Sequence, residues 1–175
     1  ETLEQAELEF EGARYVHLCR HPLGMIGSFV EARNDQVFFR HEHPYTVREL
    51  GELVWIVCHR NIQAFLEGVP GDRWCLLRYE DLTADPERGM RRVCELLGLD
   101  LDPEMLRPYA NQEWKMTDGI HPMSRMLGDV KFHEHRDIDP AVAHGWRARS
   151  PDRLSALAAR LAEALGYAVE AQHVG

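Results

Sequence analysis

The sequence predicts an α/β protein of three layers, with helices on both faces of a parallel β-sheet. The predicted elements follow the order strand, helix, helix, strand, helix, which is typical of that class. Residues 13–20 and 73–82 are apolar stretches rich in β-forming residues, without the polar alternation of a half-exposed strand. We therefore expect two strands that are covered on both faces. The length of 175 residues suits one domain, spanning residues 1–175.

Start and stop signals place the helices. Pro22 suits the first position of a helix that runs to about Arg33. Thr46 and Glu49 form a capping box at the start of the longest helix, and Gly68 closes it. Its apolar positions keep helical spacing: Leu50, Leu53, Val54, Val57, Ile62 and Phe65. The other boundaries are helix starts at Asp85, Asp102 and Ser150, each followed by proline, and helix ends at Gly98 and Gly166.

Two features indicate that the sheet is incomplete. A parallel sheet needs more than two strands to bury its apolar runs, and only two convincing strands occur here. No G-x-x-x-x-G-K-[ST] motif occurs either, so a phosphate-binding loop would have to precede Glu1. The chain also opens without methionine, and we expect it to be part of a larger polypeptide. Residues 110–137 show little periodicity and are predicted to form an extended loop region.

The composition argues against several classes of protein. A formal net charge of −9 disfavours a general nucleic-acid binder, whose affinity depends on a basic surface. No apolar run approaches the ~20 residues that cross a bilayer, so we expect no membrane partner. No signal peptide is visible, and no C-x-x-C pair occurs. We therefore expect a cytoplasmic protein whose four cysteines are reduced and buried: Cys19, Cys58, Cys75 and Cys94.

Two pairs of histidines raise the question of a zinc site. His41 and His43 are spaced i, i+2, and so are His133 and His135. Neither pair has the i, i+4 spacing on a helix or the companion cysteines that zinc sites use. The sequence therefore predicts no metal.

The stretch "CRHPLGMIGS" is the strongest candidate for a binding site. Arg20 follows a strand, and ligands of open α/β sheets bind at the carboxyl ends of the strands. Its guanidinium offers planar, permanently charged donors that suit two phosphate oxygens. Gly24, Gly27 and Ser28 form a stripe of small residues along which a ligand can come close. From these residues alone, the simpler interpretation is favoured, in which Arg20 is a surface charge and Ser28 a small packing residue.

Three stretches together resemble the sulfotransferase family, whose enzymes move a sulfuryl group from 3′-phosphoadenosine 5′-phosphosulfate (PAPS) to an acceptor. "CRHPLGMIGS" resembles the family's 3′-phosphate motif, with Arg20 and Ser28 at the matching positions. "RYEDL" is similar to the segment whose tyrosine reaches the adenine, here Tyr79. "SRMLGDVKF" is a looser match, without the usual R-K-G order, to a late loop that closes over the 3′-phosphate. Its candidate residues are Arg125, Gly128 and Lys131.

The resemblance implies the three-layer, P-loop-like fold of sulfotransferases, with the N-terminal part that holds the phosphosulfate missing from this chain. It also implies PAPS as the donor and 3′-phosphoadenosine 5′-phosphate (PAP) as the product. In the family, the base that takes the acceptor's proton commonly lies between the two phosphate motifs, which would be upstream here. His41, His43 and His121 are left as possible acceptor-side groups, and the catalytic residues stay unassigned.

Within the family, the chain looks most like sulfotransferase domains of polyketide synthase assembly lines. This resemblance implies transfer to the β-hydroxyl of an acyl chain on an acyl carrier protein, with a small hydroxylated substrate as the alternative acceptor. The stretches that carry it are "EARNDQVFFRHEHPYTVREL", "KMTDGIHPMSRMLGDVKFHEH" and "IDPAVAHGWR".

Two other functions stay open. Without a phosphosulfate loop, the chain would be a non-catalytic remnant that binds a nucleotide or a partner protein. A P-loop nucleotide kinase shares the sheet order, but it needs an arginine-rich lid, and residues 110–137 hold only Arg125 and Arg136.

Several other polar and aromatic residues have simple structural explanations. Glu80 and Asp81 are expected to cap backbone amides near a turn. Trp114 and Trp146 are interpreted as packing residues. A basic helix face is interpreted as solvated surface that could also meet an acidic carrier protein, and it consists of Arg88, Arg91 and Arg92.

Overall fold

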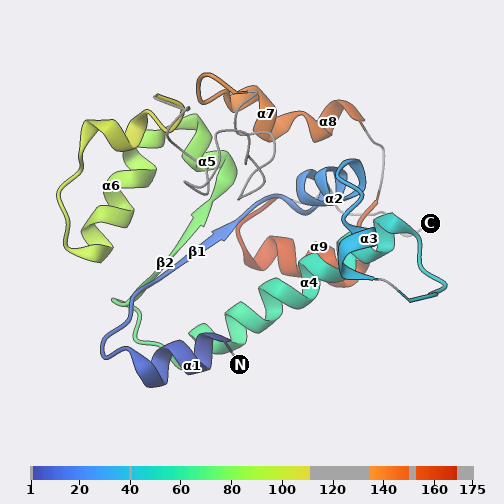
Figure 1. The fold of residues 1–175 in the computed structure, drawn as a ribbon, viewed down its shortest axis with the longest axis horizontal. Coiled ribbons are helices and arrows are strands. Elements are labelled where there is room, and N and C mark those ends of the chain that lie inside the picture. The colour runs from blue at the N-terminus through green and yellow to red at the C-terminus, as the bar shows by residue number, and fades with distance from the viewer. Residues whose placement is uncertain (1, 40, 111–134, 150–152, 169–175) are drawn as a thin grey trace, which may run out of the picture.

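The structure, a computed structural model, describes residues 2–39, 41–110, 135–149 and 153–168 (Figure 1). The first half contains α1 (Thr2–Glu9), β1 (Tyr15–Cys19), α2 (Pro22–Glu31), α3 (Asp35–Phe38) and α4 (Val47–Leu66). The second half contains β2 (Trp74–Arg78), α5 (Tyr79–Ala84), α6 (Pro86–Leu97), the 3₁₀ helix η1 (Pro103–Leu106), α7 (Pro140–His144), α8 (Trp146–Arg149) and α9 (Ala156–Ala164). No described helix is long and apolar enough to cross a membrane.

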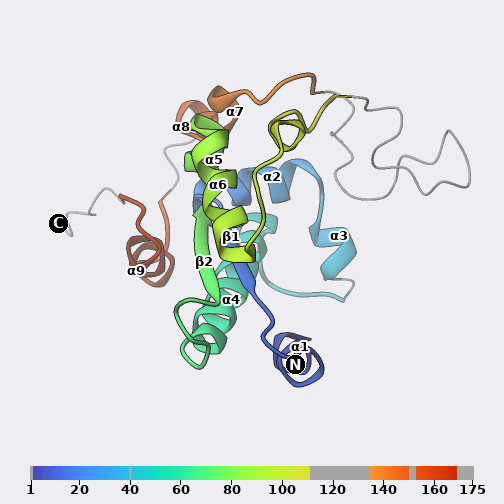
Figure 2. The ribbon, with the colours of Figure 1, turned by 90° about the vertical axis from the view of Figure 1, so that its left-hand side faces the viewer.

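The described strands form a two-stranded parallel sheet between layers of helix (Figure 1). On one face, His17 of β1 contacts His59 of α4, and Cys19 contacts Tyr167, which follows α9. On the opposite face, α6 packs closely against β2 and α5 at Gly89. Figure 2 shows α9 on one side of the strands and α3 on the other. The predicted three-layer α/β class is confirmed.

The core lies between β1, α2, α4 and α9. Trp55 is buried, and its indole N–H donates to the carbonyl oxygen of Arg20 over 3.0 Å. α2 and α4 approach closely at Gly51, where a Cβ would lie 3.1 Å from the ring of Phe29. This packing fixes the turn between β1 and α2. The largest members of the cluster are Ile26, Trp55, Ile56, Leu154, Leu161, Leu165 and Tyr167.

Most predicted helix boundaries are confirmed. Pro22 is the first residue of α2. Thr46 and Glu49 form the capping box of α4, in which the Glu49 N–H donates to Thr46 Oγ1 over 3.2 Å. Gly98 ends α6 in the left-handed region with a φ of 71°, which glycine adopts without strain.

Two predicted boundaries are wrong. The last helix begins after Ser155, whose hydroxyl caps it, and not at Ser150. The strand predicted over residues 73–82 ends at Arg78, and α5 follows without a loop. The Arg78 side chain pairs with a carboxylate three residues further on at 2.7 Å, a contact that a helical turn allows. Tyr79 is therefore the first residue of a helix and not the end of a strand.

One face of β1 is exposed, which corrects the expectation that both faces are covered. Val16 and Leu18 are 40% and 53% exposed although both are apolar. Because neighbouring residues of a parallel strand bond to opposite sides, the pairing with β2 also leaves their backbone groups at the free edge of β1. Within the described residues, this edge has no partner strand. The predicted incompleteness of the sheet agrees with these observations.

The face that α4 buries differs from the predicted apolar stripe. Leu53 and Val57 are exposed, whereas Trp55 and His59 are buried. α4 is apolar around much of its circumference, so spacing alone does not select the face that meets the sheet. Cys58 is also exposed, which corrects the expectation of four buried cysteines, although all four are free thiols.

Candidate anion-binding site at the strand ends

Arg20 and Ser28 lie together at the carboxyl end of β1. Arg20 directly follows the strand, and the ring of His21 caps α2 by accepting from the Leu23 N–H over 3.3 Å. Ser28 comes about two helical turns after Arg20, so it returns to the same side of the helix. Arg20 Nη1 donates to Ser28 Oγ over 3.1 Å. The structure thus brings the two residues together, and their binding of a phosphate stays a prediction.

Tyr79 joins this pair from the end of the neighbouring strand. As the first residue of α5, it follows the carboxyl end of β2 (Figure 1). The guanidinium carbon of Arg20 lies 4.8 Å from the centroid of its ring, which is a cation–π contact. We call Arg20, Ser28 and Tyr79 the Arg20 site. Its three residues come from three segments and meet at one end of the sheet.

The partners of Arg20 among the described residues are all neutral. Besides Ser28 and Tyr79, Arg20 contacts the carbonyl oxygen of Val142, to which Nη2 donates over 3.5 Å. Among the described residues, no carboxylate forms an ion pair with Arg20. Its positive charge is therefore free to interact with an external anion.

Glu80 and Tyr167 fix the turn that carries Arg20. Glu80 accepts from the backbone N–H of His21 over 3.0 Å and from the hydroxyl of Tyr167 over 2.9 Å. Burial, with further contributions from Cys19 and Glu80, raises the pKa of Tyr167, so the phenol stays protonated and donates. Both carboxylate oxygens of Glu80 are thus engaged inside the protein, in line with the structural interpretation of this residue.

Only part of the predicted stripe of small residues on α2 is open. A Cβ at Gly24 would lie 3.1 Å from both Arg20 Nε and Trp146 Cδ1, so these side chains fill the space beside it. Gly27 has no other atom within 4 Å of the corresponding position. A ligand can approach α2 at Gly27 and Ser28 but not at Gly24, which corrects the expectation for the whole stripe.

Sequence reasoning missed the place of Trp146 beside this site. The rings of Trp146 and His21 stack with 3.8 Å between centroids and 8° between planes. Burial lowers the pKa of His21 to about 4, so the stacked imidazole is neutral near pH 7. The contact joins segments far apart in the sequence, and no local pattern signals it.

The other predicted site residues do not add to the Arg20 site. His41 and His43 are exposed residues in the segment before α4. No group of three or more His, Cys, Asp or Glu side chains among the described residues could hold a metal ion. Four candidates lie outside the described residues: Arg125, Gly128, Lys131 and His121.

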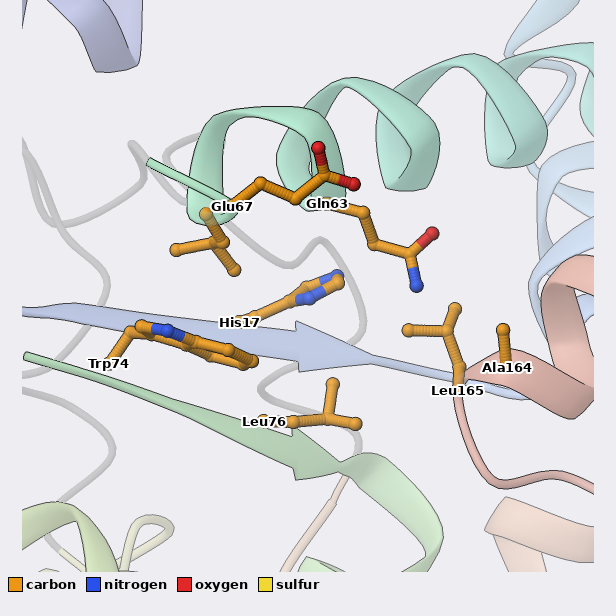
Figure 3. A pocket seen from close by; sticks show the side chains of 8 residues that line it. His17, Gln63, Glu67, Trp74, Leu76, Ala164 and Leu165 are labelled. Atoms are coloured by element: carbon orange, nitrogen blue, oxygen red, sulfur yellow. The ribbon is translucent and has the colours of Figure 1, made fainter. Parts of the chain in front are cut away.

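Two cavities in the described part of the chain lie away from Arg20. One, of about 340 Å³, opens between α4, the strands and α9, and Figure 3 shows His17, Gln63 and Trp74 around it. The other, of about 600 Å³, lies between α6, β2 and the end of α9.

The arginines of α6 are engaged locally: Arg88 with Asp85, Arg91 with Glu87, and Arg92 with the Leu76 carbonyl oxygen.

Residues 1–103 match the model of a family described as the sulfotransferase family. The chain belongs to this family. It is 32% identical to a sulfotransferase domain from the curacin biosynthetic pathway, with a TM-score of 0.84 over 96% of this chain and 58% of that one. It is also 32% identical to a sulfotransferase domain from the Synechococcus PCC 7002 olefin synthase, with a TM-score of 0.78 over 96% and 54%. A search among curated proteins found no significant match.

These similarities confirm the predicted sulfotransferase fold and the resemblance to domains of polyketide synthase assembly lines. They favour a sulfotransferase over a nucleotide kinase. The chain spans 58% and 54% of the two solved chains. We use the term full-length domain for a protein in which residues 1–175 follow an upstream segment that brings them to the length of these relatives.

A buried histidine pair joins the sheet to α4, and its member on β1, His17, lines the cavity in Figure 3. His17 Nε2 and His59 Nδ1 are 2.8 Å apart, and the residues are 4% and 8% exposed. One ring donates and the other accepts, as two neutral imidazoles can. Burial lowers the pKa of both residues, to about 4 for His59.

The full-length domain should lose stability as the pH falls from 6.5 to about 4. In this window the unfolded chain binds protons at His17 and His59 that the folded chain does not, so the free energy of unfolding decreases with falling pH. His59 should contribute about 2 kcal/mol after allowance for screening by water. Denaturant unfolding at a series of pH values measures the effect.

Two variants control this prediction. His59→Gln should reduce the pH dependence without abolishing it, because His21 titrates in the same window. His43→Gln, at an exposed position, should leave it unchanged. Equal stability at both ends of the window would contradict the prediction.

Proposed function

We propose that this chain is the C-terminal portion of a single PAPS-dependent sulfotransferase domain. The observation that carries the proposal is the meeting of Arg20, Ser28 and Tyr79 at the strand ends of a chain from this family. In the proposal, Arg20 and Ser28 bind the 3′-phosphate of PAPS, and Tyr79 contacts the adenine. The same contacts hold the product PAP.

The chemistry of these groups suits a phosphate. A guanidinium presents N–H donors in a fixed plane, matched to two phosphate oxygens, and the Ser28 hydroxyl adds a neutral donor. Arg20 has only neutral partners among the described residues, so a phosphate would be its first counter-charge. The space beside Gly27, the residue before Ser28, is open.

Sulfuryl transfer places further demands that these residues do not meet. The acceptor oxygen forms a bond to sulfur as the bond from sulfur to the phosphate oxygen breaks, and charge develops on that leaving oxygen. A base must take the acceptor's proton, and a cation must neutralise the leaving phosphate. We expect both groups in the upstream segment, and His41, His43 and His121 stay acceptor-side candidates. The Arg20 site would supply binding energy and position the donor.

The acceptor we propose is the β-hydroxyl of an acyl chain on an acyl carrier protein, with a small hydroxylated substrate as the alternative. The similarity to domains from the curacin pathway and from an olefin synthase supports this choice. We also propose that the protein acts in the cytoplasm, which the four free cysteines support.

The full-length domain should sulfonate a carrier-bound β-hydroxyacyl chain faster than the free acid. A bound carrier protein adds binding energy remote from the reacting hydroxyl, so kcat/KM should be at least about tenfold higher. Transfer of labelled sulfate from PAPS to the two acceptors measures the difference. Faster sulfonation of free phenols or steroids would contradict the proposed acceptor. Binding of PAPS without transfer to any hydroxyl would indicate the non-catalytic remnant.

A further inference from the structure

α7 and α8, two short helices at the same end of the strands as α5, contact Arg20 and its neighbour His21 (Figures 1 and 2). Arg20 Nη2 donates to the carbonyl oxygen of Val142 in α7 over 3.5 Å. Trp146 of α8 stacks on His21, the residue after Arg20. At Gly24, Arg20 Nε and Trp146 Cδ1 both lie 3.1 Å from the position of a Cβ, so the two atoms are separated by at most twice that distance.

We infer that Trp146 is a positioning residue, which holds the Arg20 guanidinium in the orientation needed to bind the 3′-phosphate. The inference rests on the proposed function of the Arg20 site. A carboxylate commonly orients a guanidinium through paired hydrogen bonds, and no described carboxylate pairs with Arg20. Neutral groups take that role: the Ser28 hydroxyl, the Tyr79 ring, the Val142 carbonyl and the edge of Trp146.

Packing, and not hydrogen bonding, holds the inner part of the Arg20 side chain. Its Nε is buried without a hydrogen-bond partner among the described residues, as is Nε1 of Trp146. A buried donor without a partner gains free energy by turning toward water. The edge of Trp146 lies beside the same glycine, Gly24, as Arg20 Nε, and in our inference it closes that route. Removal of the indole would therefore free Arg20 to turn away from Ser28.

An Arg20 side chain that is free to turn keeps its charge but no longer has a fixed orientation toward the phosphate. Binding a phosphate then requires ordering of the side chain, and affinity falls by the free energy of that ordering. The loss concerns the 3′-phosphate, so PAP should bind more weakly while adenosine 5′-phosphate changes little. A Trp146 that only supported the fold would affect both nucleotides equally.

Calorimetric titration of the full-length domain with PAP and with adenosine 5′-phosphate tests the inference. Trp146→Ala should lower the affinity for PAP about tenfold and that for adenosine 5′-phosphate less than about twofold. Trp146→Phe should restore most of the affinity for PAP, because a phenyl ring still stacks on His21. Gly24→Ala, which crowds Arg20 and the indole, should also lower the ratio of the affinity for PAP to that for adenosine 5′-phosphate. Trp74→Ala, at the opposite end of the sheet, is the matched control and should leave the ratio unchanged.

The outcomes separate this inference from the proposed function. If Trp146→Ala and Gly24→Ala leave the ratio of the affinity for PAP to that for adenosine 5′-phosphate unchanged, whether both affinities fall equally or neither falls, the role of Trp146 is overturned. If Trp146→Ala does not fold, Gly24→Ala decides. Arg20→Ala in the same titration tests the proposed function itself. If it leaves the ratio of the affinity for PAP to that for adenosine 5′-phosphate unchanged, the proposed function is overturned. A ratio lowered by Arg20→Ala alone would overturn only the positioning role.

Discussion

Arg20→Ala should weaken the binding of PAP to the full-length domain about tenfold to a hundredfold, because a charge-assisted hydrogen bond contributes roughly 1.5–3 kcal/mol. Adenosine 5′-phosphate lacks the 3′-phosphate, so it should bind weakly to the wild type and to Arg20→Ala, with nearly the same affinity. Calorimetric titration of the two proteins with both nucleotides measures the contrast. A loss confined to PAP is the specific sign that Arg20 contacts the 3′-phosphate.

Three further variants sharpen this experiment. Ser28→Ala should have a smaller effect, since a neutral hydroxyl is a weaker donor than the guanidinium that bonds to it. Arg20→Lys keeps the charge but loses the planar arrangement of donors. Its affinity for PAP should therefore lie between that of the wild type and that of Arg20→Ala. Arg91→Ala, an exposed arginine paired with Glu87 on α6, should bind like the wild type. Equal losses for both nucleotides in Arg20→Ala would mean that Arg20 supports the fold or the 5′ side.

Local sequence signals predicted the part of the Arg20 site that lies within one short segment. A strand end, a proline at the first helical position and the period of the helix together place Ser28 beside Arg20. The sequence predicts that Tyr79 ends a strand, and the structure shows that it begins a helix, yet both place it at the carboxyl end of β2. Its contact with Arg20 follows from parallel pairing, because the two strands end side by side.

Contacts between distant segments could not be read from local patterns. Trp146 reaches Gly24 because α8 packs on α2, and its stretch of sequence carries no sign of that partner. The face of α4 that meets the sheet depends on tertiary packing, which buries Trp55 and exposes Leu53. The pairing of His17 with His59 depends on the same choice of face.

Residues 1–175 expressed alone should be poorly soluble or molten. Val16 and Leu18 expose apolar side chains, and their backbone groups lie at an edge of β1 without a described partner. Two parallel strands, one of which has a bare face, bury too little apolar surface to offset the conformational entropy of the chain. A bare edge also favours pairing with other chains. Circular dichroism and calorimetry should therefore show no cooperative thermal transition, and light scattering should show association.

One substitution in two lengths of chain tests the reason for this behaviour. In residues 1–175 alone, Leu18→Glu removes an exposed apolar side chain and should raise solubility. In the full-length domain we expect upstream elements to cover β1, so the new carboxylate would be buried without a partner and should lower the free energy of unfolding by at least about 2 kcal/mol. Leu8→Glu, at a position on α1 that is 82% exposed, is the control and should change stability by less than about 0.5 kcal/mol. A cooperative transition of monomeric residues 1–175, or a neutral Leu18→Glu in the full-length domain, would mean that the two strands need no further partner.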